Sequence, residues 1–115
     1  MNVIKKAACK QYHPPKHDET IHAMYLQHKD NGCKAPFWVG CSYYLPGAKA
    51  EMCNTPLDKT YVVLEGEITV ELDNGQVAKL YEGDSVYIGP DETREVRNDT
   101  NDVAKMLVIM PYPKS

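Results

Sequence analysis

The sequence predicts an all-β fold, a sandwich or a barrel built from short strands. Short runs rich in β-branched and aromatic residues follow one another at close spacing, and turn residues separate them. No window shows the apolar period of an amphipathic helix. The turn markers are His13-Pro14-Pro15, Asp30-Asn31-Gly32, Pro46-Gly47, Asp73-Asn74-Gly75 and Gly89-Pro90-Asp91.

Eight runs are expected to form strands because strand-forming residues fill each of them between turn markers. In chain order they span residues 21–28, 37–45, 59–64, 67–72, 77–81, 85–88, 94–97 and 103–110. The clearest connection lies in EITVELDNGQVAKL, where alternating apolar residues precede Asp73-Asn74-Gly75. This turn sequence favours the positive-φ backbone of a tight turn, so the segment is predicted to be a β-hairpin.

Length and composition fit one small domain. The chain has 115 residues, of which 43% are hydrophobic and 25% charged, and a net charge of −3. Dispersed basic residues argue against nucleic acid as a partner. The absence of a long apolar run argues against a membrane-spanning segment. The opening residues lack the apolar region of a signal peptide, so we expect a cytoplasmic location. Cysteines in that compartment are expected to be reduced. Residues 1–20 are expected to form an N-terminal arm and residues 21–115 the barrel domain.

Residues 47–66 carry a spacing that resembles the first motif of the cupin superfamily, G(X)5HXH(X)3E(X)6G. Gly47 and Gly66 occupy the two glycine positions of that motif. The family's two histidine ligands and its glutamate ligand are replaced by Cys53, Thr55 and Lys59. The frame of the motif is therefore present without its metal ligands.

Residues 83–98, GDSVYIGPDETREVRN, resemble the second cupin motif, G(X)5PXG(X)2H(X)3N. Gly83 and Asn98 occupy its ends, and Arg94 stands at the histidine position. The resemblance covers residues 36–110 and implies a small, single-domain cupin-2 type barrel, that is, a double-stranded β-helix of the jelly-roll kind. It also implies a homodimer, since an arm in small cupins often pairs with a neighbouring subunit.

The substituted positions make a poor site for a divalent metal, because Arg offers no lone pair and Lys is a cation at neutral pH. We therefore expect no metal and no cofactor at the family position. If the alignment holds, Lys59 and Arg94 point into the barrel together with Cys53 and Thr55, and Tyr61 shares the face of Lys59.

Two buried cations need an anionic counterpart, because an unpaired buried charge is costly. Glu51 is one internal candidate, since an extended segment would place it on the same face as Cys53. The alternative is a small molecule that carries a carboxylate or a phosphate, with Arg94, Lys59, Thr55, Cys53 and Tyr61 as its binding residues. Both interpretations stay open at this point.

Two enzymatic alternatives also stand. The first is a metal-free isomerase, lyase or decarboxylase for a carboxylated substrate, with Glu51, Cys53 and Lys59 as candidate catalytic residues. The second is a metal-dependent enzyme with ligands elsewhere in the chain, for which the arm offers a loosely spaced series: Cys9, His13, His17, His22 and His28.

Overall fold

The computed structural model describes residues 1–13 and 18–113. Strands dominate these residues, with two short 3-10 helices, η1 (Lys6–Ala8) and η2 (Lys29–Asn31). The strands are β1 (Gln11–Tyr12), β2 (Ile21–Gln27), β3 (Phe37–Tyr44), β4 (Lys49–Cys53), β5 (Lys59–Glu65), β6 (Ile68–Leu72), β7 (Val77–Leu80), β8 (Ser85–Ile88), β9 (Arg94–Arg97) and β10 (Ala104–Pro111).

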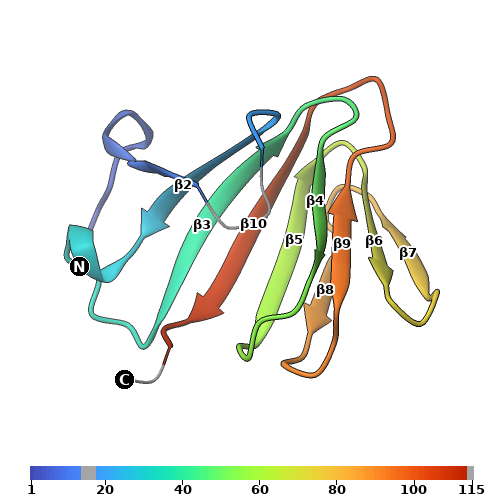
Figure 1. Cartoon of the computed structure of the whole chain (residues 1–115). Coiled ribbons are helices and arrows are strands. Elements are labelled where there is room, and N and C mark those ends of the chain that lie inside the picture. The colour runs from blue at the N-terminus through green and yellow to red at the C-terminus, as the bar shows by residue number, and fades with distance from the viewer. Residues whose placement is uncertain (14–17, 114–115) are drawn as a thin grey trace.

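The strands form two antiparallel sheets that face each other (Figure 1). The larger sheet has the order β1-β2-β3-β10-β5-β8, and the smaller has the order β4-β9-β6-β7. Consecutive strands such as β3 and β4, or β8 and β9, lie in different sheets, so the chain repeatedly crosses between the layers. The fold is all-β with a jelly-roll arrangement, as the sequence predicted.

Alternation along the strands places one face of each sheet in a shared core. In β5 the residues Lys59, Tyr61 and Val63 are buried and alternate with partly exposed ones. The core of the smaller sheet includes Ile68 and Val96, and neither has more than 1% of its surface exposed. Burying an aliphatic side chain of this size stabilises a fold by roughly 1.5–3 kcal/mol, so these contacts hold the two layers together.

All eight predicted strands are present with small shifts at their ends, and β6 and β7 form the predicted hairpin across a positive-φ Gly75. The sequence reading missed β1 and β4. A pair of residues such as Gln11–Tyr12 carries no recognisable pattern, and the charged residues of β4 conceal its alternation. The turn expected at His13-Pro14-Pro15 falls largely on residues outside the described ranges.

The motif glycine Gly66 is required by its backbone and by its surroundings. Its φ is 76°, a left-handed conformation that favours glycine. A Cβ atom built there would lie 2.9 Å from the carbonyl oxygen of Val103. The glycine therefore lets the β5–β6 turn lie against the segment that leads into β10.

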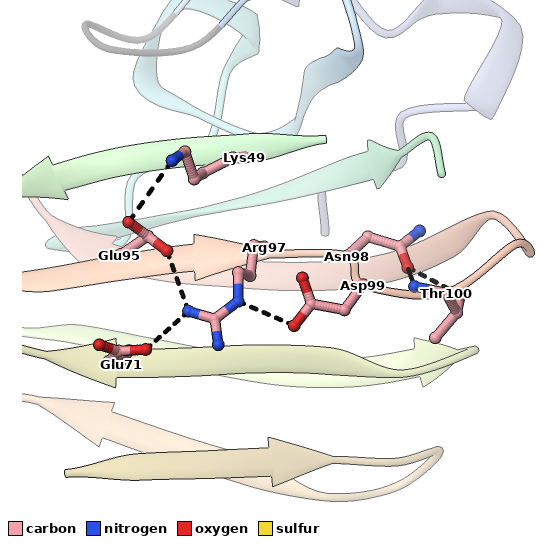
Figure 2. A network of polar contacts seen from close by, with 7 residues as sticks. All are labelled: Lys49, Glu71, Glu95, Arg97, Asn98, Asp99 and Thr100. Carbon is pink, nitrogen blue, oxygen red and sulfur yellow. Dashed lines mark hydrogen bonds and ion pairs between the residues drawn. The ribbon is translucent and has the colours of Figure 1, made fainter. Parts of the chain in front are cut away.

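Strand β9 carries a buried residue toward the core and an ion-pair network on its other face. Arg97 donates hydrogen bonds to Glu71 (2.8 Å), Glu95 (2.9 Å) and Asp99 (2.8 Å), as Figure 2 shows. Glu71 and Glu95 are directly opposite each other on β6 and β9, where like charges repel. Arg97 bridges them on the face of β9 opposite the buried Arg94 and Val96.

Within residues 1–13 and 18–113, no helix has the length and apolar character needed to cross a membrane.

Candidate functional site

A cavity of about 550 Å³ lies between the two sheets, a volume typical of small-molecule sites. Its wall combines residues of β2, β3, β5, β9 and β10 with the end of β4, the segment that follows it and the N-terminal arm. The lining residues are Tyr12, His13, Tyr25, Trp38, Ser42, Tyr44, Cys53, Asn54, Thr55, Lys59, Tyr61, Arg94, Met106, Val108 and Met110. The structure thus brings together the five predicted ligand-binding residues, whose roles stay predictions.

Lys59 begins β5 and is 2% exposed, which is rare for a lysine. Its Nζ donates a hydrogen bond to Thr55 Oγ1 at 2.8 Å and another to the Leu57 carbonyl at 3.1 Å. Burial lowers the pKa of Lys59, and the positive charge of Arg94 lowers this pKa further. The amine is therefore held in place by uncharged oxygens rather than by a carboxylate.

Arg94 begins β9 and is 8% exposed. Its Nε donates to the Tyr61 hydroxyl at 3.1 Å, and its Nη1 donates to the Glu51 backbone carbonyl at 3.3 Å. A guanidinium has five N–H groups, so these two bonds leave three donors that no bond among the described residues occupies. The free donors belong to Nη1 and Nη2, the pair that grips a carboxylate or phosphate from two sides.

Tyr61 is buried and its hydroxyl accepts the Arg94 hydrogen bond, and no acceptor within residues 1–13 and 18–113 takes its own proton. Burial raises the pKa of Tyr61 even though Arg94 opposes the shift, so the hydroxyl stays protonated at neutral pH.

The cavity carries a net positive charge. Lys59 and Arg94 line it, and no Asp or Glu lies in its wall among the residues that the structure describes. The remaining residues, 14–17 and 114–115, carry no acidic side chain either. Asp58 and Glu92 influence the pKa of Lys59 from outside the lining, where the Tyr87 hydroxyl donates to Asp58 and the Gly89 N–H donates to Glu92.

The expectation that Glu51 shares the inward face with Cys53 is wrong. The pairing of β4 with β9 shifts register between Ala50 and Cys53, and such a bulge changes which side chains point inward. Ala50 is buried, Glu51 is exposed, and Cys53 returns to the cavity wall. Only the backbone carbonyl of Glu51 reaches Arg94, so its carboxylate does not balance the two cations.

An aromatic cluster forms the other end of the wall. The rings of Tyr12 and Tyr25 stack with centroids 4.1 Å apart, and both meet Trp38 edge-on. Gly40 makes room for this packing, since a Cβ there would lie 2.8 Å from a Trp38 ring atom and 3.2 Å from the Tyr12 hydroxyl. The cluster gives the cavity a flat apolar surface beside its charged groups.

The donor set does not fit a divalent metal. Two of the four motif positions hold cations, and Lys59 already directs its amine to Thr55. No three His, Cys, Asp or Glu side chains gather into a metal-binding group in residues 1–13 and 18–113. Of the histidines in the arm series, His13 lines the cavity, His22 is exposed, His28 is buried outside the lining, and His17 lies outside the described residues.

Sequence reasoning missed several lining residues. Met106, Val108 and Met110 occupy alternate positions of β10, so alternation within this predicted strand offered a signal for them. Tyr12 and His13 offered none, because their arm reaches the cavity only through the pairing of β1 with β2.

Comparison with known proteins places this geometry in a family. Residues 41–110 match the family described as the cupin domain. The chain is 35% identical over 113 residues to the β-D-galactosidase Rv1717 of Mycobacterium tuberculosis, an alignment that covers 98% of this chain and 96% of that protein.

Solved structures share the fold at low sequence identity. The polyketide cyclase RemF of Streptomyces resistomycificus superposes with a TM-score of 0.83 at 18% identity, covering 96% of this chain and 79% of that one. A predicted oxalate decarboxylase of Thermotoga maritima gives a TM-score of 0.79 at 14% identity, covering 96% and 99%. These likenesses establish the barrel architecture alone.

Proposed function

The chain belongs to the cupin family, and from this premise we propose that its barrel binds a small molecule carrying a carboxylate or a phosphate, without a metal. The observation that carries the proposal is the pair of buried cations, Lys59 and Arg94, in a cavity whose described wall contains no acidic side chain. An anion entering the cavity offsets the cost of burying these charges.

Arg94 is the main anchor in this proposal. Its three remaining N–H donors permit a two-pronged contact with a carboxylate or a phosphate. The Tyr61 hydroxyl adds a neutral donor next to the guanidinium, and Lys59 adds a nearby point charge. Cys53 and Thr55 complete the wall around these groups.

The aromatic cluster supports a ligand with a flat or apolar body. Tyr12, Tyr25 and Trp38 offer ring surfaces that bury such a body at low conformational cost. The cavity of about 550 Å³ has room for a molecule with both an anionic group and a ring.

Glycoside hydrolysis, the activity in the name of the Mycobacterium tuberculosis relative, is a weaker candidate for this cavity. Most glycosidases use two carboxyl groups that flank the scissile bond. The cavity wall offers no such pair in the described part of the chain, and the Glu51 side chain is exposed. A metal-free lyase or isomerase for a carboxylated substrate fits the same residues better, because Lys59 supplies an amine of lowered pKa.

Isothermal titration with benzoate, benzamide and inorganic phosphate tests the proposal. We expect benzoate or phosphate to bind and benzamide, the uncharged counterpart of benzoate, to bind much more weakly. Arg94→Gln should weaken anion binding roughly tenfold or more, since hydrogen bonds to charged groups contribute about 1.5–3 kcal/mol.

Arg97→Gln is the matched control, because it removes the same charge from the same strand on the opposite face. This variant should bind the anions as the wild type does. Equal affinity for benzoate and benzamide, or equal losses in both variants, would overturn the proposal. Turnover of a nitrophenyl β-D-galactoside that Arg94→Gln leaves unchanged would show that the cavity does not require an anion.

A further inference from the structure

We propose that Lys59 condenses with the carbonyl group of an aldehyde acid or a 2-oxo acid and forms an imine while Arg94 holds the carboxylate of the same molecule. This inference rests on the proposed function and narrows its ligand class to carboxylates that carry a reactive carbonyl. It requires an amine that faces the cavity, an open position on its nitrogen and an anchor for the carboxylate.

The hydrogen bonds of Lys59 leave one position on its nitrogen open. Nζ carries three positions besides its bond to carbon, and Thr55 Oγ1 and the Leu57 carbonyl take two of them. Both partners accept N–H bonds, so a neutral amine that donates to both has its lone pair on the third position. Lys59 lines the cavity, where a carbonyl carbon can approach that lone pair.

The surroundings of Lys59 raise its fraction of neutral amine above that of an exposed lysine, although the protonated form remains the cation of the anion site. The residue is 2% exposed, and Arg94 faces the same cavity with a permanent charge. Cys53, Asp58 and Glu92 oppose this effect, but burial and Arg94 outweigh them and the pKa of Lys59 is lowered. A desolvated lysine next to another cation is an activated nucleophile for carbonyl compounds.

The condensation balances without any further reagent. The Nζ lone pair forms a bond to the carbonyl carbon, and the carbonyl oxygen takes up the two amine protons and leaves as water. The product is an imine, which a proton converts to an iminium ion. Its positive charge and that of Arg94 then lie beside one substrate carboxylate, which offsets one of the two charges.

Apolar and aromatic side chains of the larger sheet line the cavity beside the proposed imine. Tyr44 is buried in the wall, and Met106 and Val108 lie beside it on the larger sheet. Trp38 and Tyr25 cover the cavity from the direction of the arm.

Reductive trapping tests the inference on the full chain. Glyoxylate and sodium cyanoborohydride are added near neutral pH, and peptide mass mapping locates each carboxymethyl group. We expect Lys59 to be labelled several times faster than the exposed Lys79, because a lowered pKa leaves a larger fraction of free amine at neutral pH and Arg94 holds the glyoxylate carboxylate nearby. Propanal, an aldehyde without a carboxylate, should show a smaller preference for Lys59.

Two variants separate anchoring from reactivity. Lys59→Arg keeps the charge but should lose the carboxymethyl group at position 59 while Lys79 is labelled as before. Arg94→Gln should remove the preference for glyoxylate over propanal. Labelling spread over exposed lysines with Lys59 untouched in the wild type would overturn the inference, whether or not a variant folds.

The two proposals fail separately. Benzoate has no carbonyl that can condense, so benzoate binding without glyoxylate labelling of Lys59 removes the imine and leaves the anion site standing. Absence of both benzoate binding and labelling removes the anion site itself.

Discussion

Replacing Asn98 should lower the free energy of unfolding by much more than the loss of one average hydrogen bond. Asn98 closes the second motif and is 0% exposed. Its Nδ2 donates to the carbonyls of Tyr44 (2.9 Å), Leu45 (3.3 Å) and Asp102 (2.8 Å). Its Oδ1 accepts from the N–H and the hydroxyl of Thr100. One amide thus joins the end of β3 to the β9–β10 loop, and Figure 2 shows its contact with Thr100.

The magnitude follows from these bonds. Four or five neutral hydrogen bonds at about 1 kcal/mol each, with buried carbonyls left unpaired, give Asn98→Ala a loss of roughly 3–5 kcal/mol. Asn98→Asp keeps the volume but sets a carboxylate against three carbonyl oxygens. Such a carboxylate has a raised pKa in the folded state, so the loss should shrink as the pH falls and the group takes up a proton.

Urea unfolding followed by tryptophan fluorescence measures both variants, with Asn101→Ala as the control in the same loop, where the side chain is exposed. The control should stay within about 0.5 kcal/mol of the wild type. A loss below about 1 kcal/mol for Asn98→Ala would refute the reasoning, because the buried amide would then carry no more than one average hydrogen bond.

Three further perturbations follow from the site and its supports. Lys59→Met should remove a pH dependence of stability. The folded pKa of Lys59 is lowered below 10.5, so the stability of the wild type relative to the variant should rise as the pH increases toward 10.5, and a flat difference in urea midpoints would contradict this. Gly40→Ala should cost roughly 1–3 kcal/mol and shift the emission of the single tryptophan, Trp38, since its Cβ would lie 2.8 Å from that ring; an unchanged spectrum would count against the contact. Arg97→Gln should cost about 1–2 kcal/mol by leaving Glu71 opposite Glu95, and the loss, measured as a shift in melting temperature, should shrink in high salt; a salt-independent loss would argue against electrostatics.

Most of the fold could be predicted because its signals are local. The Asp73-Asn74-Gly75 turn, the alternation in β5 and the glycine spacing of both motifs depend on residues close together in the chain. The parity of Lys59 and Tyr61 followed from the same alternation and is confirmed by their burial. Local patterns fail where the pairing is irregular, and the bulge between Ala50 and Cys53 is the example, since it turned Glu51 out of the cavity.

The sequence by itself determined the barrel, the replacement of the metal ligands and the presence of two cations at motif positions. Only the tertiary structure decided which groups these cations contact. Lys59 rests on Thr55 and a backbone carbonyl, and Arg94 on Tyr61 and another carbonyl. The aromatic wall also needed the fold, because Tyr12 reaches the cavity by pairing with β2. Strand pairing between distant residues determines which groups meet, and burial determines how strongly their charges interact. The spacing of neighbouring residues in the sequence indicates neither the pairing partners nor the burial.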